Sequence, residues 1–273
     1  MRLPTRYRVL AAVCGILTSA AGASAQSAAS ASHSAGDPIA IAPVGRLPFA
    51  PGEKLVFAGK VHTAVSGGGT LWVEGPVELR GTTTWLLHSD MEGRVGPLRA
   101  TDRNASWLDP IRMTALRYTS RERHIVSKHD DAVDIFAGEK RWRADNGAEG
   151  VTATSAPLDE LSFLYYVRTL RLTTDTTIAV ARHFDVSRNP TVLKVTGREE
   201  IQVAAGRFRA VVVEMRVRDP RRYKGEGIIR IHLSDDACRL ILRLDSRVPD
   251  AGPATLELQS YEGVRPGCAA KIG

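Results

Sequence analysis

The stretch from Ile201 to Val217, IQVAAGRFRAVVVEMRV, decides the fold of this chain. Ile201–Val203 and Phe208–Val217 are rich in β-branched and apolar residues, and Ala204–Arg207 separates them. Gly206 stands where the chain must turn, and glycine adopts turn conformations at little steric cost. The stretch therefore predicts two antiparallel strands joined by a short loop.

Similar short segments with polar turns extend outward from this hairpin in both directions. The further predicted strands are 54–61, 70–73, 77–80, 82–89, 116–123, 123–128, 132–137, 177–184, 227–233, 239–248 and 254–261. Gly67–Gly69 is expected to be a hairpin turn, and Gly75-Pro76 a break between strands. Many short strands of this kind favour a sandwich or a barrel. The predicted fold class is mainly β, with an antiparallel curved sheet or incomplete β-barrel and one packed helix.

That helix is expected over about 157–169. Pro157 offers a helix-start proline, Asp159 and Glu160 follow it, and Arg168 lies near the end. Acids early and bases late in a helix complement its dipole. At helical spacing its packing side consists of Leu158, Leu161, Leu164 and Tyr165. The helix either fills the core of the sheet or forms a lid over a ligand cavity.

The N-terminus has the three parts of a secretory signal peptide. Arg2, Arg6 and Arg8 precede an apolar run over 9–22, and Ala23–Ala25 has the small-x-small pattern of a cleavage site. The predicted signal peptide is 1–25, cleaved after Ala25, and the expected location is periplasmic or secreted. Bulky Val13 before Cys14 argues against lipidation. No stretch is long enough for a transmembrane segment.

The rest of the chain divides by composition. Residues 26–47 are rich in Ala, Ser, Gly and Pro and are expected to be a disordered linker. A single β-rich domain is expected over 48–264, followed by a tail over 265–273. Three of the basic residues and no acidic ones lie in 1–25, so cleavage lowers the net charge from +7 to +4. This mild excess argues against nucleic acid as a partner.

Cys238 and Cys268 are the two cysteines of the mature chain, and they are a candidate disulfide. A predicted hairpin centred near residue 251 brings Cys238 towards the region after Glu262, so the tail can carry Cys268 back to it. Two unpaired thiols are the alternative.

The sequence carries no catalytic motif, no phosphate-binding loop and no Cys-x-x-Cys pair, so no catalytic, cofactor or metal residues are assigned. Four residues close together in the sequence resemble a metal cluster: His124, His129, Asp130 and Asp131. Because this short span crosses a predicted turn, the residues share no obvious common face, which favours a solvated turn over a metal site. A hydrolase would need a histidine beside a carboxylate in a pocket; the candidate histidines are His88, His183 and His232.

Basic residues cluster around Asp219-Pro220, between two predicted strands. They are Arg216, Arg218, Arg221, Arg222 and Lys224. They are either a solvated strand end or a candidate site for an anionic headgroup, since arginine forms forked hydrogen bonds to phosphate.

Five blocks of the chain resemble DUF3108, a family of uncharacterised domains in bacterial envelope proteins. They are residues 48–55 (PFAPGEKL), 106–110 with the strand 116–118, 158–168 (LDELSFLYYVR), 203–210 (VAAGRFRA) and 233–237 (LSDDA). The resemblance spans 48–262 and implies an address in the envelope but no reaction. More distantly, the chain looks like the half-barrels of periplasmic lipoprotein carriers, an analogy of fold alone.

Three functions follow from these observations. The first is a non-enzymatic binding or carrier protein for a lipid-like or envelope ligand, without a cofactor. The second is a structural or assembly factor of the cell envelope. The third, a hydrolase, has the weakest support in the sequence.

Overall fold

The computed structural model describes residues 47–61, 65–95, 98–124, 127–220, 223–249, 252–268 and 271–272. The signal peptide with its cleavage site after Ala25, and the linker up to residue 46, lie outside the described residues. Arg221 and Arg222 of the basic cluster also lie outside them.

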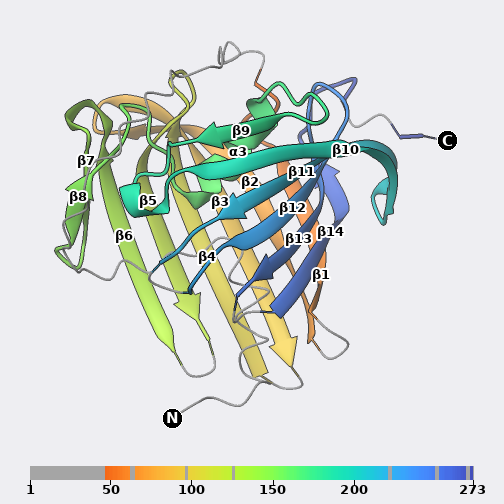
Figure 1. Ribbon diagram of the computed structural model, residues 1–273, viewed down its shortest axis with the longest axis horizontal. Helices are drawn as coiled ribbons and strands as arrows, with labels where there is room; N and C mark the ends of the chain where they lie inside the picture. The colour runs from red at the N-terminus through yellow and green to blue at the C-terminus, as the bar shows by residue number, and fades with distance from the viewer. Residues whose placement is uncertain are drawn as a thin grey trace.

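Fourteen antiparallel strands form one continuous curved sheet in the described residues (Figure 1). The strands are β1 (Lys54–Val61), β2 (Val65–Leu79), β3 (Thr82–Val95), β4 (Leu98–Asp109), β5 (Thr114–Arg123), β6 (Lys128–Phe136), β7 (Arg141–Ala144), β8 (Glu149–Val151), β9 (Thr177–Val180), β10 (Thr191–Val203), β11 (Gly206–Val217), β12 (Gly227–Ser234), β13 (Ile241–Val248) and β14 (Gly252–Glu262). Their spatial order is β8-β7-β6-β5-β4-β3-β2-β1-β14-β13-β12-β11-β10-β9. The ends β8 and β9 are not paired with each other, so the sheet is an incomplete barrel. The predicted fold class is confirmed.

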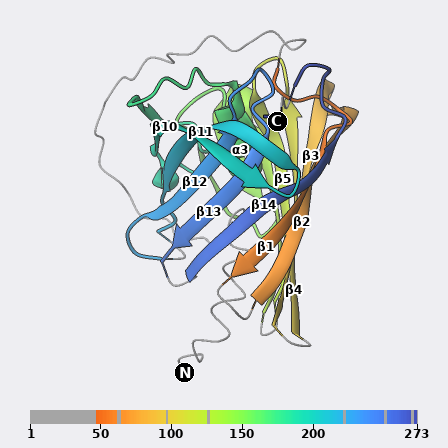
Figure 2. The same ribbon diagram turned by 90° about the vertical axis from the view of Figure 1, so that its right-hand side faces the viewer.

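The sheet curves over until its two halves face each other. Figure 2 shows β10–β13 on one side and β1–β4 on the other, with the helix between them near one end. Residues from both halves, such as Leu87 of β3 and Ile231 of β12, belong to the same buried apolar cluster. The core therefore lies on the concave inner face.

The predicted hairpin at 201–217 is present as β10 and β11, with Val203 paired with Gly206. The expected turn at Gly67–Gly69 is wrong, because all three glycines lie within β2. A Cβ atom on Gly67 would stand 2.3 Å from the Glu92 carbonyl oxygen, and one on Gly68 would stand 2.4 Å from that of Phe57. These glycines permit close approach of the neighbouring strands β3 and β1 and do not reverse the chain.

The helix α3 spans Glu160–Thr169, so it begins three residues later than the expected start at 157. Asp159 is its N-cap: its Oδ1 accepts a hydrogen bond from the Ser162 amide at 2.9 Å, and the Ser162 hydroxyl accepts one from the Asp159 amide at 2.9 Å. This capping box ends the extended segment that contains Leu158. Leu158, Leu161, Leu164 and Tyr165 are all buried, and α3 packs against β3 and β4. None of the helices among the described residues is long and apolar enough to cross a membrane.

One buried ion pair attaches α3 to the start of β1. The Arg168 guanidinium donates to both carboxylate oxygens of Glu53, at 2.6 and 2.8 Å, and its Nη2 also donates to the carbonyls of Pro48 and Cys238. Cys238 is joined to Cys268 by a disulfide with a Cα–Cα distance of 5.4 Å. Helix, first strand and C-terminal segment are thus connected at one place.

Candidate functional site

The inner face of the sheet carries a cross-strand row of polar side chains. Ser89 of β3 pairs with Asn104 of β4, Asn104 with Ser120 of β5, and Ser120 with Asp131 of β6. Directly paired residues point to the same face of a sheet, and all four side chains are buried. We call Ser89, Asn104, Ser120 and Asp131 the polar row.

Three polar atoms of this row have no hydrogen-bond partner among the described residues: Ser89 Oγ, Asn104 Nδ2 and Ser120 Oγ. A buried polar group without a partner costs about 1–3 kcal/mol. Such groups in a native protein call for water or a ligand. The polar row is therefore a candidate place on the inner face for ordered water or a ligand.

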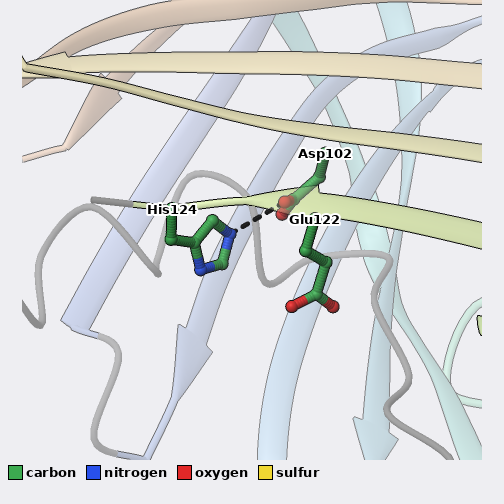
Figure 3. Close-up of side chains that lie close together, drawn as sticks. All are labelled: Asp102, Glu122 and His124. Atoms are coloured by element: carbon green, nitrogen blue, oxygen red, sulfur yellow. Dashed lines mark hydrogen bonds and ion pairs between the residues drawn. The ribbon is translucent and has the colours of Figure 1, made fainter. Parts of the chain in front are cut away.

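Two carboxylates and one histidine gather beside the polar row. Asp102 of β4 pairs across the strands with Glu122 of β5, and His124 directly follows β5. Figure 3 shows the three side chains close together, with His124 Nε2 at 2.8 Å from Asp102 Oδ1. One potential ligand atom from each side chain lies within 4.8 Å of the others. Both carboxylates are buried, and His124 is half-buried.

Further polar side chains, joined by hydrogen bonds, lie on the inner face between the polar row and α3. The Ser106 hydroxyl donates to Asp159 Oδ2 at 2.6 Å, and the Tyr118 hydroxyl donates to Asn104 Oδ1 at 3.0 Å. Burial raises the pKa of Asp159 to about 7, against the opposing hydrogen bonds from Ser106 and Ser162. Polar groups thus extend from the helix cap to the Asp102–Glu122–His124 cluster.

The other half of the sheet presents a matching row that is entirely apolar. Val195 of β10, Val213 of β11, Ile231 of β12, Leu244 of β13 and Leu256 of β14 are successive cross-strand partners. Each is at most 1% exposed, and all belong to the main apolar cluster. We call these five residues the apolar row. The inner face is therefore amphipathic, with its polar and apolar linings on different halves of one sheet.

Two of the three described members of the predicted basic cluster, Arg216 and Arg218, pair with acids. Arg218 lies 2.7 Å and Arg216 3.7 Å from Glu226 carboxylate oxygens, and Arg216 also lies 3.5 Å from Glu214. The hydrogen bond from Arg218 lowers the pKa of Glu226. Lys224 is exposed. An anionic-ligand site here stays a prediction.

The structure places three of the four residues that resemble a metal cluster in the sequence on the inner face, with His129 directly opposite Glu122, and places Asp130 on the outer face. His124 contacts Asp102 on the inner face, whereas the exposed Asp130 pairs with Arg123 at 2.7 Å. His129 Nε2 lies 2.8 Å from Asp131. The sequence does not indicate Asp102 or Glu122. The only signal for them is the spacing of Asp102 and Asn104 two residues apart in a strand, and that spacing alone does not tell an inner from an outer face.

Each histidine named for a hydrolase has a carboxylate nearby. His88 lies 3.3 Å from Glu74, His183 lies 3.0 Å from Glu160, and His232 lies 2.9 Å from Glu199 and 3.3 Å from Asp245. His88 also stacks on Trp72 and lines a pocket of about 400 Å³ with it on the outer face. The hydrolase alternative therefore stays a prediction.

Comparison with known proteins gives a family and a fold. A crystal structure of a β-barrel-like protein of the domain of unknown function DUF1849, from Brucella abortus, is similar with a TM-score of 0.50 and 8% identity, over 78% of this chain and 97% of that one. A candidate lipoprotein from Parabacteroides distasonis has a TM-score of 0.33 at 10% identity, over 79% and 97% of the two chains. A candidate exported protein with a YmcC-like fold, from Bacteroides fragilis, has a TM-score of 0.30 at 10% identity, over 80% and 98%.

No curated protein matches the chain. The DUF1849 protein is described as β-barrel-like, and at 8% identity the likeness concerns the fold alone. The family model described as protein of unknown function DUF3108 matches residues 61–259. This range covers the whole sheet except the first seven residues of β1 and the last three of β14. The chain belongs to the DUF3108 family.

Proposed function

We propose that this chain is a non-enzymatic binding or carrier protein that works outside the cytoplasm and holds an amphipathic component of the cell envelope on the inner face of its sheet. The observation that carries the proposal is that the inner face has an apolar row on β10–β14 and a polar row on β3–β6. A purely structural core would be apolar on both halves, since buried polar groups without partners destabilise it.

The chemistry of the two rows indicates the kind of ligand. The five residues of the apolar row are already at most 1% exposed, so an acyl chain would reach them only if the two halves of the sheet move apart. It would then be held by burial of apolar surface, which is favourable and non-directional. Hydroxyl, amide or amine groups of a headgroup suit Asn104, Ser120 and their neighbours, which offer both donors and acceptors. The signal-peptide pattern and the Cys238–Cys268 disulfide support an oxidising compartment outside the cytoplasm.

The alternative of a scaffold that pairs its sheet edges with another protein has less support. The edge strands β8 and β9 are only three and four residues long. Short edge strands are one of the means by which proteins limit pairing with other chains.

Native mass spectrometry of the chain purified from the periplasm tests the proposal. We expect a bound species of lipid-like mass that organic extraction releases. A chain that is consistently empty would contradict a carrier, and one persistent protein partner after crosslinking in cells would support the scaffold instead.

A matched pair of variants tests the site. Ser120→Ala removes a hydroxyl from the polar row, whereas Thr119→Ala removes one from the outer face of the same strand. We expect Ser120→Ala to weaken retention of the co-purified ligand and Thr119→Ala to leave it unchanged. Equal retention by both variants would show that the polar row does not bind the ligand.

A further inference from the structure

We propose that Asp102, Glu122 and His124 bind one divalent first-row transition-metal ion, of which Zn²⁺ is the representative. The proposal goes beyond ligand carriage and does not depend on it. It also departs from the expectation, drawn from the sequence, that the chain has no metal site.

The geometry brings one donor atom from each side chain to nearly the required separation. Asp102 and Glu122 are held opposite each other by strand pairing, and His124 follows Glu122 by two residues. Their donor atoms lie within 4.8 Å of one another (Figure 3). Donors bound at about 2.0–2.2 Å in a tetrahedral zinc site stand roughly 3.3–3.6 Å apart. The separations therefore exceed the spacing of zinc ligands by at most about 1.5 Å, which rotations of the side chains would have to close.

A second observation points to a ligand at the same place. Asn104 and Ser120 lie two residues from Asp102 and Glu122 on the same strands, so they share the inner face. Asn104 is 3% and Ser120 4% exposed, yet Asn104 Nδ2 and Ser120 Oγ have no partner among the described residues. Three protein ligands leave a fourth position for water, and a water ligand needs such hydrogen-bonding neighbours.

The charges along these strands also fit a cation. Asp102 and Glu122 lie directly opposite each other, and a cation bound by both carboxylates reduces the repulsion between like charges. The neighbouring Arg103 and Arg123 form ion pairs on the outer face, with Asp90 at 3.1 Å and Asp130 at 2.7 Å.

The donor set selects the class of metal. Carboxylates alone suit Ca²⁺, Mg²⁺ and Mn²⁺, whereas an imidazole favours zinc and its first-row neighbours. One imidazole with two carboxylates is a donor set for a transition metal with an open coordination position.

Isothermal titration calorimetry of the chelator-treated full chain with ZnCl₂ tests the proposal. We expect one site, with affinity at least about tenfold weaker in His124→Ala and in Glu122→Gln. His88→Gln is the matched control, since His88 is another histidine beside a carboxylate, Glu74, on the outer face. It should bind Zn²⁺ like the wild type. Unchanged stoichiometry and affinity in the double variant His124→Ala/Glu122→Gln would overturn the proposal, as would tighter binding of Ca²⁺ than of Zn²⁺.

X-ray absorption of the zinc-loaded wild type keeps the proposal testable if the variants do not fold. We expect only nitrogen and oxygen ligands at about 2.0 Å, with the scattering pattern of a single imidazole. A spectrum with two or more imidazoles, or with sulfur, would assign the zinc to other residues and overturn the proposal.

Discussion

Replacing Arg168 by methionine should lower the free energy of unfolding by about 3–5 kcal/mol, the usual cost of removing one partner of a buried ion pair. The Arg168 side chain is 0% and that of Glu53 2% exposed, and two hydrogen bonds of 2.6 and 2.8 Å join them. Burial opposes the charged form of Arg168, but Glu53 outweighs it, so the pKa of Arg168 is raised. Arg168 is therefore held charged in the folded state.

The magnitude follows from what the substitution leaves behind. Methionine keeps much of the apolar stem, so the main cost is a buried Glu53 without its cation. The carbonyls of Pro48 and Cys238 also lose a donor, at 3.1 and 3.0 Å. Each unsatisfied buried group costs about 1–3 kcal/mol. Relaxation of the surroundings and entry of water limit the total, which keeps it near the stated range.

Urea unfolding of a double-mutant cycle checks this reasoning. Glu53→Gln combined with Arg168→Met removes both charges, and we expect it to cost less than the sum of the two single variants. Arg103→Met is the matched control: Arg103 lies 3.1 Å from Asp90, but the side chains are 59% and 36% exposed. An exposed pair of this kind contributes about 0–1 kcal/mol. A loss at Arg168 no larger than the loss at Arg103, or strict additivity in the cycle, would refute the argument.

Three further changes have defined outcomes. Burial raises the pKa of Asp159 from 3.8 to about 7, so between these pH values the folded chain binds a proton there that the unfolded chain releases. The free energy of unfolding of the wild type should therefore fall as the pH rises from about 4 to about 7, and it should fall less steeply in Asp159→Asn. Denaturant titrations at several pH values would show this. Cys268→Ser should lower the free energy of unfolding by about 3–4 kcal/mol, because the lost disulfide joins cysteines 30 residues apart in the sequence. In thermal unfolding, a reductant should then destabilise the wild type and leave the variant unchanged. Ser120→Ala should stabilise the ligand-free chain by about 1 kcal/mol in urea unfolding, because it removes a buried hydroxyl that lacks a partner among the described residues; a loss of stability would contradict this.

Local sequence patterns predict where the strands of this chain lie, but they do not predict the structural role of each glycine. Gly206 directly follows the turn at Ala204-Ala205 and begins β11. The flanking strand residues indicate this turn, so the β10–β11 hairpin could be predicted. Gly67–Gly69 has the composition of a turn but lies within β2, where neighbouring backbones approach closely. Close approach is a property of the assembled sheet, and no local signal separates it from chain reversal.

The same limit applies to the start of the helix. Pro157 is a favourable first residue of a helix, but Asp159 and Ser162 form the capping box that sets the observed start. Ser106, more than fifty residues earlier in the chain, also donates to Asp159. A long-range contact thus supports a boundary that local preferences place elsewhere.

The candidate site could not be predicted, because it depends on the register of strands. Asp102 meets Glu122 only through the pairing of β4 with β5, which contains a register shift between Trp107 and Leu108. A shift of one residue would turn the site to the outer face. The sequence indicates His124 as a possible ligand, but it groups His124 with Asp130, which pairs with Arg123 on the outer face, and gives no reason to group it with Asp102.

The two halves of the sheet make different contributions, and this difference connects stability with function. The apolar row on β10–β14 is fully buried and stabilises the fold whatever the chain binds. The polar row on β3–β6 reduces stability, since three of its buried atoms have no hydrogen-bond partner among the described residues. Selection for stability alone would replace these side chains by apolar ones. Functional sites, in contrast, commonly retain residues that lower the stability of the fold. The cost is therefore concentrated where a ligand or an ion can offset it, and this location is why the inner face of β3–β6 is the part of the molecule on which binding experiments should concentrate.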